Sequence, residues 1–260
     1  MEHLPEFFDI WRDTLQWQPD EVIQSRFRQL FDRVLEGNQR LNLTRITEPR
    51  EFWEKHLWDS LSGLAWLQRE RSEFLAKPLS AIDVGTGAGF PGVPLAIVYP
   101  DWKVTLLDST RKKIDFLTTL TAELGLQNTR TVVGRAEAVG KTKDHRSSYD
   151  LVCTRAVGNA SLCANYAFPF LKVGGIAILY RGLWTEEETA ALEPTVAALG
   201  GKIERIEAFQ TPLTGGVRHC IYLSKQEEIR DRSLKLKGAG GGRQEMESVE
   251  SVLSKEINNE

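Results

Sequence analysis

The chain has 260 residues, enough to bury a full hydrophobic core, and its formal net charge of -3 excludes a protein whose whole surface binds nucleic acid. Its three cysteines are unevenly spaced and form no C-x-x-C pair, which excludes a zinc site of cysteines alone and a disulfide framework. We find no basic, apolar leader and no apolar run long enough to cross a bilayer, so we expect a cytoplasmic, monomeric protein without a membrane contact.

Apolar side chains recur at helical spacing through residues 1–75. Residues 4–17 predict a short docking helix, and Pro19-Asp20-Glu21 begins a second helix that we expect to end at Gly37. Glu48-Pro49 opens a third helix. Together these segments predict an N-terminal helical extension.

From residue 76 to 224, strand-like and helix-like segments alternate, which predicts a mostly parallel sheet covered on both faces. The expected strands are 81–84, 103–108, 131–137, 149–155, 176–180, 202–209 and 217–223. The expected helices are 93–98, a helix capped by Ser109-Thr110 and closed by Gly125, a helix through 162–170 that ends at Gly174-Gly175, and 186–199. The unbroken apolar run at 176–180 predicts a central strand. Residues 225–260 predict a disordered tail.

The last two expected strands are joined by only seven residues, Gln210 to Gly216. Because this join is too short for a crossover helix, the two strands must pair antiparallel. A parallel sheet that ends in an antiparallel hairpin is usual for S-adenosylmethionine-dependent methyltransferases and unusual for nicotinamide domains. The sequence therefore predicts an α/β, Rossmann-like methyltransferase domain behind the helical extension.

A glycine-rich loop, Asp83 to Gly92, follows the first expected strand. Glycines are needed where the backbone takes positive φ or lets a ligand approach closely, and the helix that follows offers unpaired N–H groups. Residues 87–92 also satisfy G-x-G-x-x-G, a weak signal for any nucleotide-like ligand. A ligand of this class is the expected occupant.

Acidic residues follow the second and third expected strands. Asp108 is placed to accept hydrogen bonds from a ribose diol, although an aspartate there is also a common helix N-terminal acid. Ala136-Glu137 would lie near an adenine, whose exocyclic amine needs an acceptor. A plain surface acid explains Glu137 equally well.

Four arginines stand at strand ends and predict a basic mouth on an otherwise neutral protein: Arg135, Arg155, Arg181 and Arg218. Each alone is more often an ordinary exposed residue, so the prediction rests on their shared placement. Arg155 directly follows the fourth strand, where a cation orients a ligand carboxylate or grips an RNA phosphate. It is our candidate for a catalytic position.

Two further observations bear on the chemistry. His56 and Asp59 are three residues apart on one helix, which fits a structural histidine with a local partner or a wall of the cleft. Cys153 lacks the context of a cytosine-methylating nucleophile, and no Asn/Asp-Pro-Pro-aromatic motif is present. Both absences favour a target atom that is already nucleophilic.

The combination of motifs resembles the small-subunit ribosomal RNA guanine-N7 methyltransferases, the family once called glucose-inhibited division protein B. The match runs from about residue 20 to 224 and is carried by these segments: Asn42-Leu43-Thr44, Lys55 to Ser60, Asp83 to Gly92, Leu106 to Ser109, Thr154-Arg155-Ala156 and Arg218-His219. The resemblance implies a class I enzyme that methylates a guanine near the decoding region of the small-subunit rRNA, with that rRNA or the ribosomal subunit as its partner.

The resemblance also implies roles for residues. Those carried over to S-adenosylmethionine are Gly85, Phe90, Asp108, Ser109, Thr110, Ala136, Glu137 and Arg155. Arg135 and Arg218 match family arginines that meet the RNA, and Arg181 stands where the family often has lysine. No metal is implied.

The target suggests a mechanism, and three rival functions stay open. N7 of guanine has a free lone pair and no proton to lose, so the reaction depends on positioning and needs no general base. The rivals are a nicotinamide-dependent oxidoreductase, a non-catalytic binding module and a small-molecule methyltransferase. The first lacks a Tyr-x-x-x-Lys pair, intact loop glycines speak against the second, and the helical extension and strand-end arginines favour a large anionic substrate over the third.

Overall fold

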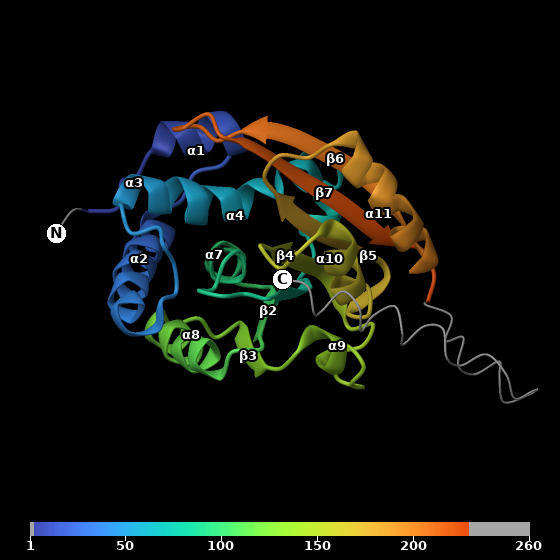
Figure 1. The fold of residues 1–260 in the computed structure, drawn as a ribbon. Helices are drawn as coiled ribbons and strands as arrows, with labels where there is room; N and C mark the ends of the chain where they lie inside the picture. The colour runs from blue at the N-terminus through green and yellow to red at the C-terminus, as the bar shows by residue number, and fades with distance from the viewer. Residues whose placement is uncertain (1–2, 229–260) are drawn as a thin grey trace, which may run out of the picture. The chain divides into compact units, whose positions relative to one another are not determined.

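The computed structural model describes residues 3–228 of the chain. At the centre of this part lies a seven-stranded sheet (Figure 1). Its order is β3-β2-β1-β4-β5-β7-β6. The strands are β1 (Ser80–Val84), β2 (Lys103–Asp108), β3 (Thr129–Val133), β4 (Tyr149–Arg155), β5 (Leu171–Arg181), β6 (Gly201–Gln210) and β7 (Val217–Lys225). The first five pair parallel, and β7 pairs antiparallel with both β5 and β6. The predicted parallel sheet with a terminal antiparallel hairpin is confirmed.

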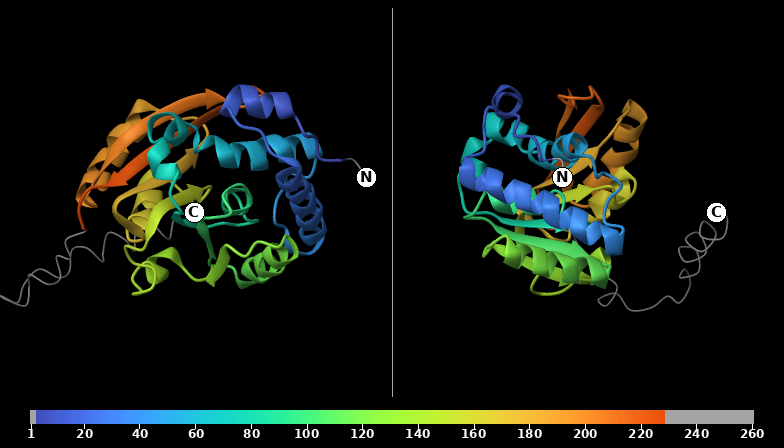
Figure 2. Two further views of the ribbon diagram at one scale, coloured as in Figure 1. Left: turned by 180° about the vertical axis from the view of Figure 1, so that it is seen from behind. Right: turned by 90° about the vertical axis from the view of Figure 1, so that its left-hand side faces the viewer.

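Helices cover both faces of the sheet, as expected from the alternating pattern. They are α1 (Phe8–Leu15), α2 (Glu21–Leu41), α3 (Pro49–Phe52), the π-helical segment η1 (Trp53–Trp58), α4 (Asp59–Ser62), α5 (Ala65–Glu70), α6 (Ser72–Leu75), α7 (Gly92–Val98), α8 (Arg111–Glu123), α9 (Ala136–Val139), α10 (Ala160–Ala167) and α11 (Glu186–Ala198). The front and back views show the N-terminal helices at one side of the sheet and α10 and α11 at the other (Figures 1 and 2).

Two hydrophobic cores lie on opposite faces of the sheet. Successive residues of β5 alternate between them, with Ile178 in the core beneath α1–α8 and Leu179 in the core beneath α9–α11. Because both faces of β5 are buried, its sequence reads as the unbroken apolar run at 176–180. The strand is interior, as predicted, although β4 occupies the middle of the order.

Three predicted boundaries were wrong. The second helix does not end at Gly37 but continues to Leu41, because Gly37 serves close packing: a Cβ there would lie 2.4 Å from Cε2 of Phe116 on α8. The predicted third strand ends at Val133, and Ala136 already begins α9. The helix before β5 ends at Ala167 rather than at Gly174-Gly175, which lie within β5 itself.

The predicted third helix is interrupted where it approaches the sheet. Glu48 caps it through both carboxylate oxygens, which accept the N–H groups of Arg50 and Glu51. It then passes through the π-helical segment η1, a conformation that is rare and often found at functional sites. The helices of residues 8–75 share one core with the sheet, so the separation of an extension at residue 75 stays a prediction. Residues 229–260 of the predicted tail lie outside the described residues.

Candidate functional site

The glycine-rich loop connects β1 to α7, and a buried carboxylate fixes its shape. Oδ2 of Asp83 accepts the hydroxyl of Thr86 at 2.7 Å and the N–H of Gly92 at 2.8 Å. Oδ1 has no hydrogen-bond partner within the described structure. Burial raises the pKa of Asp83 to about 6. The loop is therefore pinned at both ends by one acid at the end of β1.

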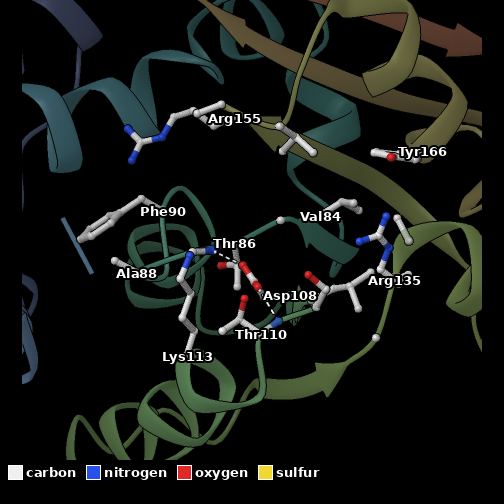
Figure 3. A pocket seen from close by; sticks show the side chains of 18 of the residues that line it. Val84, Thr86, Ala88, Phe90, Asp108, Thr110, Lys113, Arg135, Arg155 and Tyr166 are labelled. Atoms are coloured by element: carbon white, nitrogen blue, oxygen red, sulfur yellow. Dashed lines mark hydrogen bonds between the residues drawn. The ribbon is translucent and has the colours of Figure 1, made fainter. Parts of the chain in front are cut away.

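Above this loop lies a cavity of about 490 Å³, within the range of small-molecule sites (Figure 3). All eight residues predicted to hold the cofactor line it: Gly85, Phe90, Asp108, Ser109, Thr110, Ala136, Glu137 and Arg155. They come from the ends of four neighbouring strands, where ligands of such sheets bind. The structure thus brings together residues that are up to 70 positions apart in the sequence.

Asp108 ends β2 beside the glycine loop. Its Oδ2 accepts the N–H of Gly87 at 3.0 Å, and its Oδ1 accepts the N–H of Thr110 at 2.8 Å (Figure 3). Each carboxylate oxygen still has a lone pair for a ligand hydroxyl. Thr110 occupies the N-cap position of α8, but its side chain makes no capping hydrogen bond, unlike the cap we expected. Asp108 therefore orders both the loop and the start of α8.

The opposite wall of the cavity is built around Arg155. Its Nη1 donates to the carbonyl of Lys55 at 2.7 Å and to Oδ2 of Asp59 at 3.0 Å. Its guanidinium carbon also lies 5.7 Å from the centre of the Phe90 ring. Lys55 lies in the π-helical segment η1, and Asp59 directly follows it. The irregular geometry of η1 therefore sets the position of Arg155.

His56 faces the cavity in the neutral form. Its ring stacks on Phe90 with centroids 4.2 Å apart, and its Nδ1 lies 3.1 Å from Nη2 of Arg155. Because arginine has only donors, Nδ1 must accept, and Nε2–H donates to the Thr44 hydroxyl at 2.8 Å. Burial, and then the charge of Arg155, lower the pKa of His56 to about 3. The histidine thus joins the cavity wall through the arginine, and within residues 3–228 it makes no hydrogen bond or ion pair with Asp59.

A second arginine and a buried glutamate complete this wall. Nε of Arg218 lies 3.5 Å from Oδ1 of Asp59, so one carboxylate serves two arginines. Glu54, fully buried in η1, accepts the N–H groups of Leu213 and Thr214 from the loop between β6 and β7. The wall is therefore tied to the terminal hairpin that carries Arg218.

The four strand-end arginines do not all line the cavity. Arg135 lines the cavity with a side chain that is 74% exposed, and Arg155 lines it with a side chain that is 18% exposed. Arg218 reaches the same wall through Asp59. Arg181 lies apart: it donates to the carbonyl of Gly158 and lies 3.9 Å from Glu188, and it does not line the cavity. The roles of all four stay predictions.

Sequence reasoning missed several cavity residues. Lys113 and Tyr166 line the cavity without having been predicted (Figure 3), and so does Val157. Lys113 lies in the first turn of α8, a position that its place after Asp108 could have indicated. Tyr166 comes from α10, and only the three-dimensional fold brings it close to Glu137. A hydrogen bond from its own backbone N–H, followed by the Tyr166 hydroxyl, lowers the pKa of Glu137.

The residues present fit S-adenosylmethionine. Gly87 has φ +59°, and a Cβ there would meet only the carbonyl of Gly85 at 3.9 Å, so the loop leaves open space for a ligand. Asp108 offers carboxylate acceptors to the cavity at the end of β2. Within residues 3–228 there is no group of metal-ligating side chains, and no helix is long and apolar enough to span a membrane.

Comparisons with known proteins agree with this geometry. A family model described as rRNA small subunit methyltransferase G matches residues 23–220. A protein named ribosomal RNA small subunit methyltransferase G from Microcystis aeruginosa is 62% identical, with 86% of this chain and 99% of the relative covered. The relative of the same name from Trichormus variabilis is 58% identical, with 85% and 90% covered.

A solved structure shares the fold. It is a variant of the 16S rRNA (adenine(1408)-N(1))-methyltransferase from Catenulisporales acidiphilia, with a TM-score of 0.50 and 18% identity. The likeness covers 62% of this chain and 91% of that one. At this identity it supports the architecture of the sheet and its helices, and nothing finer.

Proposed function

The chain belongs to the rRNA small subunit methyltransferase G family, and from this premise we propose that it transfers a methyl group from S-adenosylmethionine to N7 of a guanine in small-subunit (16S) ribosomal RNA. The observation that carries the proposal is the cavity on which all eight expected cofactor residues converge. The small subunit or its rRNA is the proposed partner, and the cytoplasm, where ribosomal subunits occur, is the proposed location.

Named residues of the cavity would hold the cofactor. Asp108 would accept the ribose hydroxyls, and Glu137 would accept from the adenine amine. Gly87 leaves room for the methionine part beside the loop, whereas Gly85 lets the loop pack against Val157, since a Cβ there would lie 2.7 Å from Cγ2 of Val157. When bound, S-adenosylmethionine supplies an electrophilic methyl group on a positively charged sulfur. No pyrophosphate has to be accommodated, so the loop needs no phosphate-binding lysine.

The chain's contribution to the reaction would be positioning. Guanine N7 carries its lone pair without a proton, so the cavity needs no general base. The nearest imidazole fits this expectation, because Nδ1 of His56 is already engaged by Arg155 and cannot accept a proton from the substrate. Holding nucleophile and methyl group in line can lower a barrier by about 7–11 kcal/mol. Arg155 and Phe90 would form the wall against which the base is held.

Arginines would bind the RNA outside the reacting ring. Arg135 is largely exposed at the cavity rim and is free to meet a phosphate, with only a 4.0 Å contact to Glu137. Arg218 would reach the RNA beside Asp59. Arginine suits this role because its guanidinium binds a phosphate through two parallel hydrogen bonds.

Two measurements on the purified full chain test the proposal. Calorimetry should detect binding of S-adenosylmethionine and none of NAD. Incubation with S-adenosylmethionine and small ribosomal subunits from cells lacking this protein should produce 7-methylguanosine, measured by mass spectrometry of the digested rRNA. Arg155→Ala should impair cofactor binding or methylation; if it changes neither, the assignment of the cavity wall is wrong.

A further inference from the structure

A groove between α2 and α8 opens beside the cofactor cavity, and we propose that it is a second RNA subsite, which holds a single-stranded nucleotide adjacent to the target guanine. The inference rests on the proposed function. The groove has a volume of about 430 Å³. Leu41 and Lys112 line the groove, while Leu43 and Lys113 line the cavity. The two sites are thus neighbours along both chain segments.

The groove carries its unpaired positive charge at the end next to the cavity. The two helices lie side by side and run antiparallel, since Arg33 pairs with Glu123 and Gly37 packs on Phe116 (Figure 1). At the far end, Arg33 is neutralised by Glu123 at 3.0 Å and Glu36 at 2.9 Å. At the near end, Arg40 and Lys112 are exposed and have no ion-pair partner within residues 3–228.

The first turn of α8 strengthens this asymmetry. It consists of Arg111, Lys112 and Lys113 and contains no acid. Cations at the positive end of a helix dipole are unfavourable, and α11, by contrast, begins with three glutamates and a capping box. Asp108 accepts the N–H of Thr110 just before the helix, but none of these three cations has an ion-pair partner within residues 3–228, so their charge remains available to an anionic ligand. An RNA phosphate at this end of the groove would be stabilised by Arg40 and Lys112, the two cations that line it there.

The floor of the groove suits a nucleotide base. The half-buried ring of Phe116 lines it together with Leu41 and Leu120. Gly37 allows the ring to lie directly against α2 and so fixes its orientation. Proteins that bind single-stranded nucleic acid combine such an aromatic platform with neighbouring cations, which Arg40 and Lys112 supply at the near end of this groove. Asp115 is the remaining acid among the lining residues, and it leaves the near end with net positive charge.

The test compares a variant that lacks the two unpaired cations, Arg40 and Lys112, with a variant that lacks the ion-paired Arg33. We expect the double variant Arg40→Ala/Lys112→Ala to bind unmethylated small subunits, or a short single-stranded rRNA fragment, about tenfold more weakly than the wild type at physiological salt. The slope of log affinity against log salt concentration should become shallower by about 0.7 for each lost contact. Arg33→Ala is the matched control and should leave both quantities within twofold of the wild type.

Binding of S-adenosylmethionine should be unchanged in all three proteins, which shows that they are folded and that the cavity is intact. Equal RNA affinity and an equal salt slope in wild type and the double variant would overturn the subsite. A wild type that binds RNA through Arg40 and Lys112 but makes no 7-methylguanosine would overturn the proposed function and leave the subsite standing. The two claims are therefore separable.

Discussion

The floor and the wall of the cavity are built in different ways. The floor is the glycine loop with Asp83 and Asp108, whose hydrogen bonds join residues that are at most 21 positions apart. The wall joins η1 and Asp59 to Arg155 and Arg218, residues about 100 to 160 positions apart. A substitution in the floor should therefore weaken ligand binding and leave the fold intact, whereas a substitution in the wall should lower the stability of the whole fold.

The largest expected effect is on the wall. Asp59→Asn removes a buried carboxylate charge that is shared by two partly buried arginines. Because the guanidinium of Arg155, whose side chain is only 18% exposed, loses its charge partner, the free energy of unfolding should fall by about 3 kcal/mol, measured by urea denaturation. Asp9→Asn is the control, since it breaks an exposed pair with Arg12 and should leave the free energy of unfolding almost unchanged. Equal losses for the two variants would contradict the assignment of a stabilising wall.

The next effect separates the floor from the wall. Gly87→Leu places a side chain in the open space beside the loop and should weaken S-adenosylmethionine binding about 100-fold, which is about 2.7 kcal/mol. Gly125→Leu introduces a comparable backbone strain, at φ +66°, with nothing within 4 Å and away from the cavity. Calorimetry should find normal cofactor affinity in this second variant. Loss of binding in both would mean that strain, and not the cavity, decides affinity.

The free energy of unfolding should depend on pH through His56, which lies in the cavity wall. His56 is neutral in the folded chain because its pKa is about 3, but it protonates in the unfolded chain below about 6.5. The unfolded state therefore binds more protons, and this histidine lowers the free energy of unfolding by about 2 kcal/mol between pH 7 and pH 5. Asp83, with its pKa raised to about 6, acts in the opposite direction.

The contribution of His56 can be isolated by comparing wild type with His56→Asn. Asp83 contributes to both proteins, so its effect cancels in the difference between their unfolding free energies. That difference should shift by about 2 kcal/mol in favour of the variant between pH 7 and pH 5. A difference that is independent of pH would show that the histidine is not held neutral.

The smallest effect is expected where the wall meets the solvent. Arg218→Gln removes a partner of Asp59 at 3.5 Å, and its side chain is 28% exposed. Since Asp59 keeps Arg155, thermal and urea unfolding should show a loss of only about 0.5–1 kcal/mol. A loss as large as that of Asp59→Asn would place Arg218, rather than Arg155, at the centre of the wall.

The same contrast explains what could be predicted from the sequence. The sheet, its hairpin and the placement of Asp108 followed from strand patterns and from the rule that ligands bind at strand ends. The partners of Arg155 did not follow, because one is a backbone carbonyl and the others depend on the phase of an irregular helical turn. Gly37 was misread as a helix end, since its packing against Phe116 is a long-range contact without a local signal.

The account is tested most directly by the modification itself. Small-subunit rRNA from cells lacking this protein should lose one 7-methylguanosine, detected by mass spectrometry of nuclease fragments. Expression of the wild-type chain should restore it, and expression of Gly87→Leu should not. Unchanged 7-methylguanosine in the deletion strain, or full restoration by Gly87→Leu, would contradict the proposal that this cavity carries out the methyl transfer.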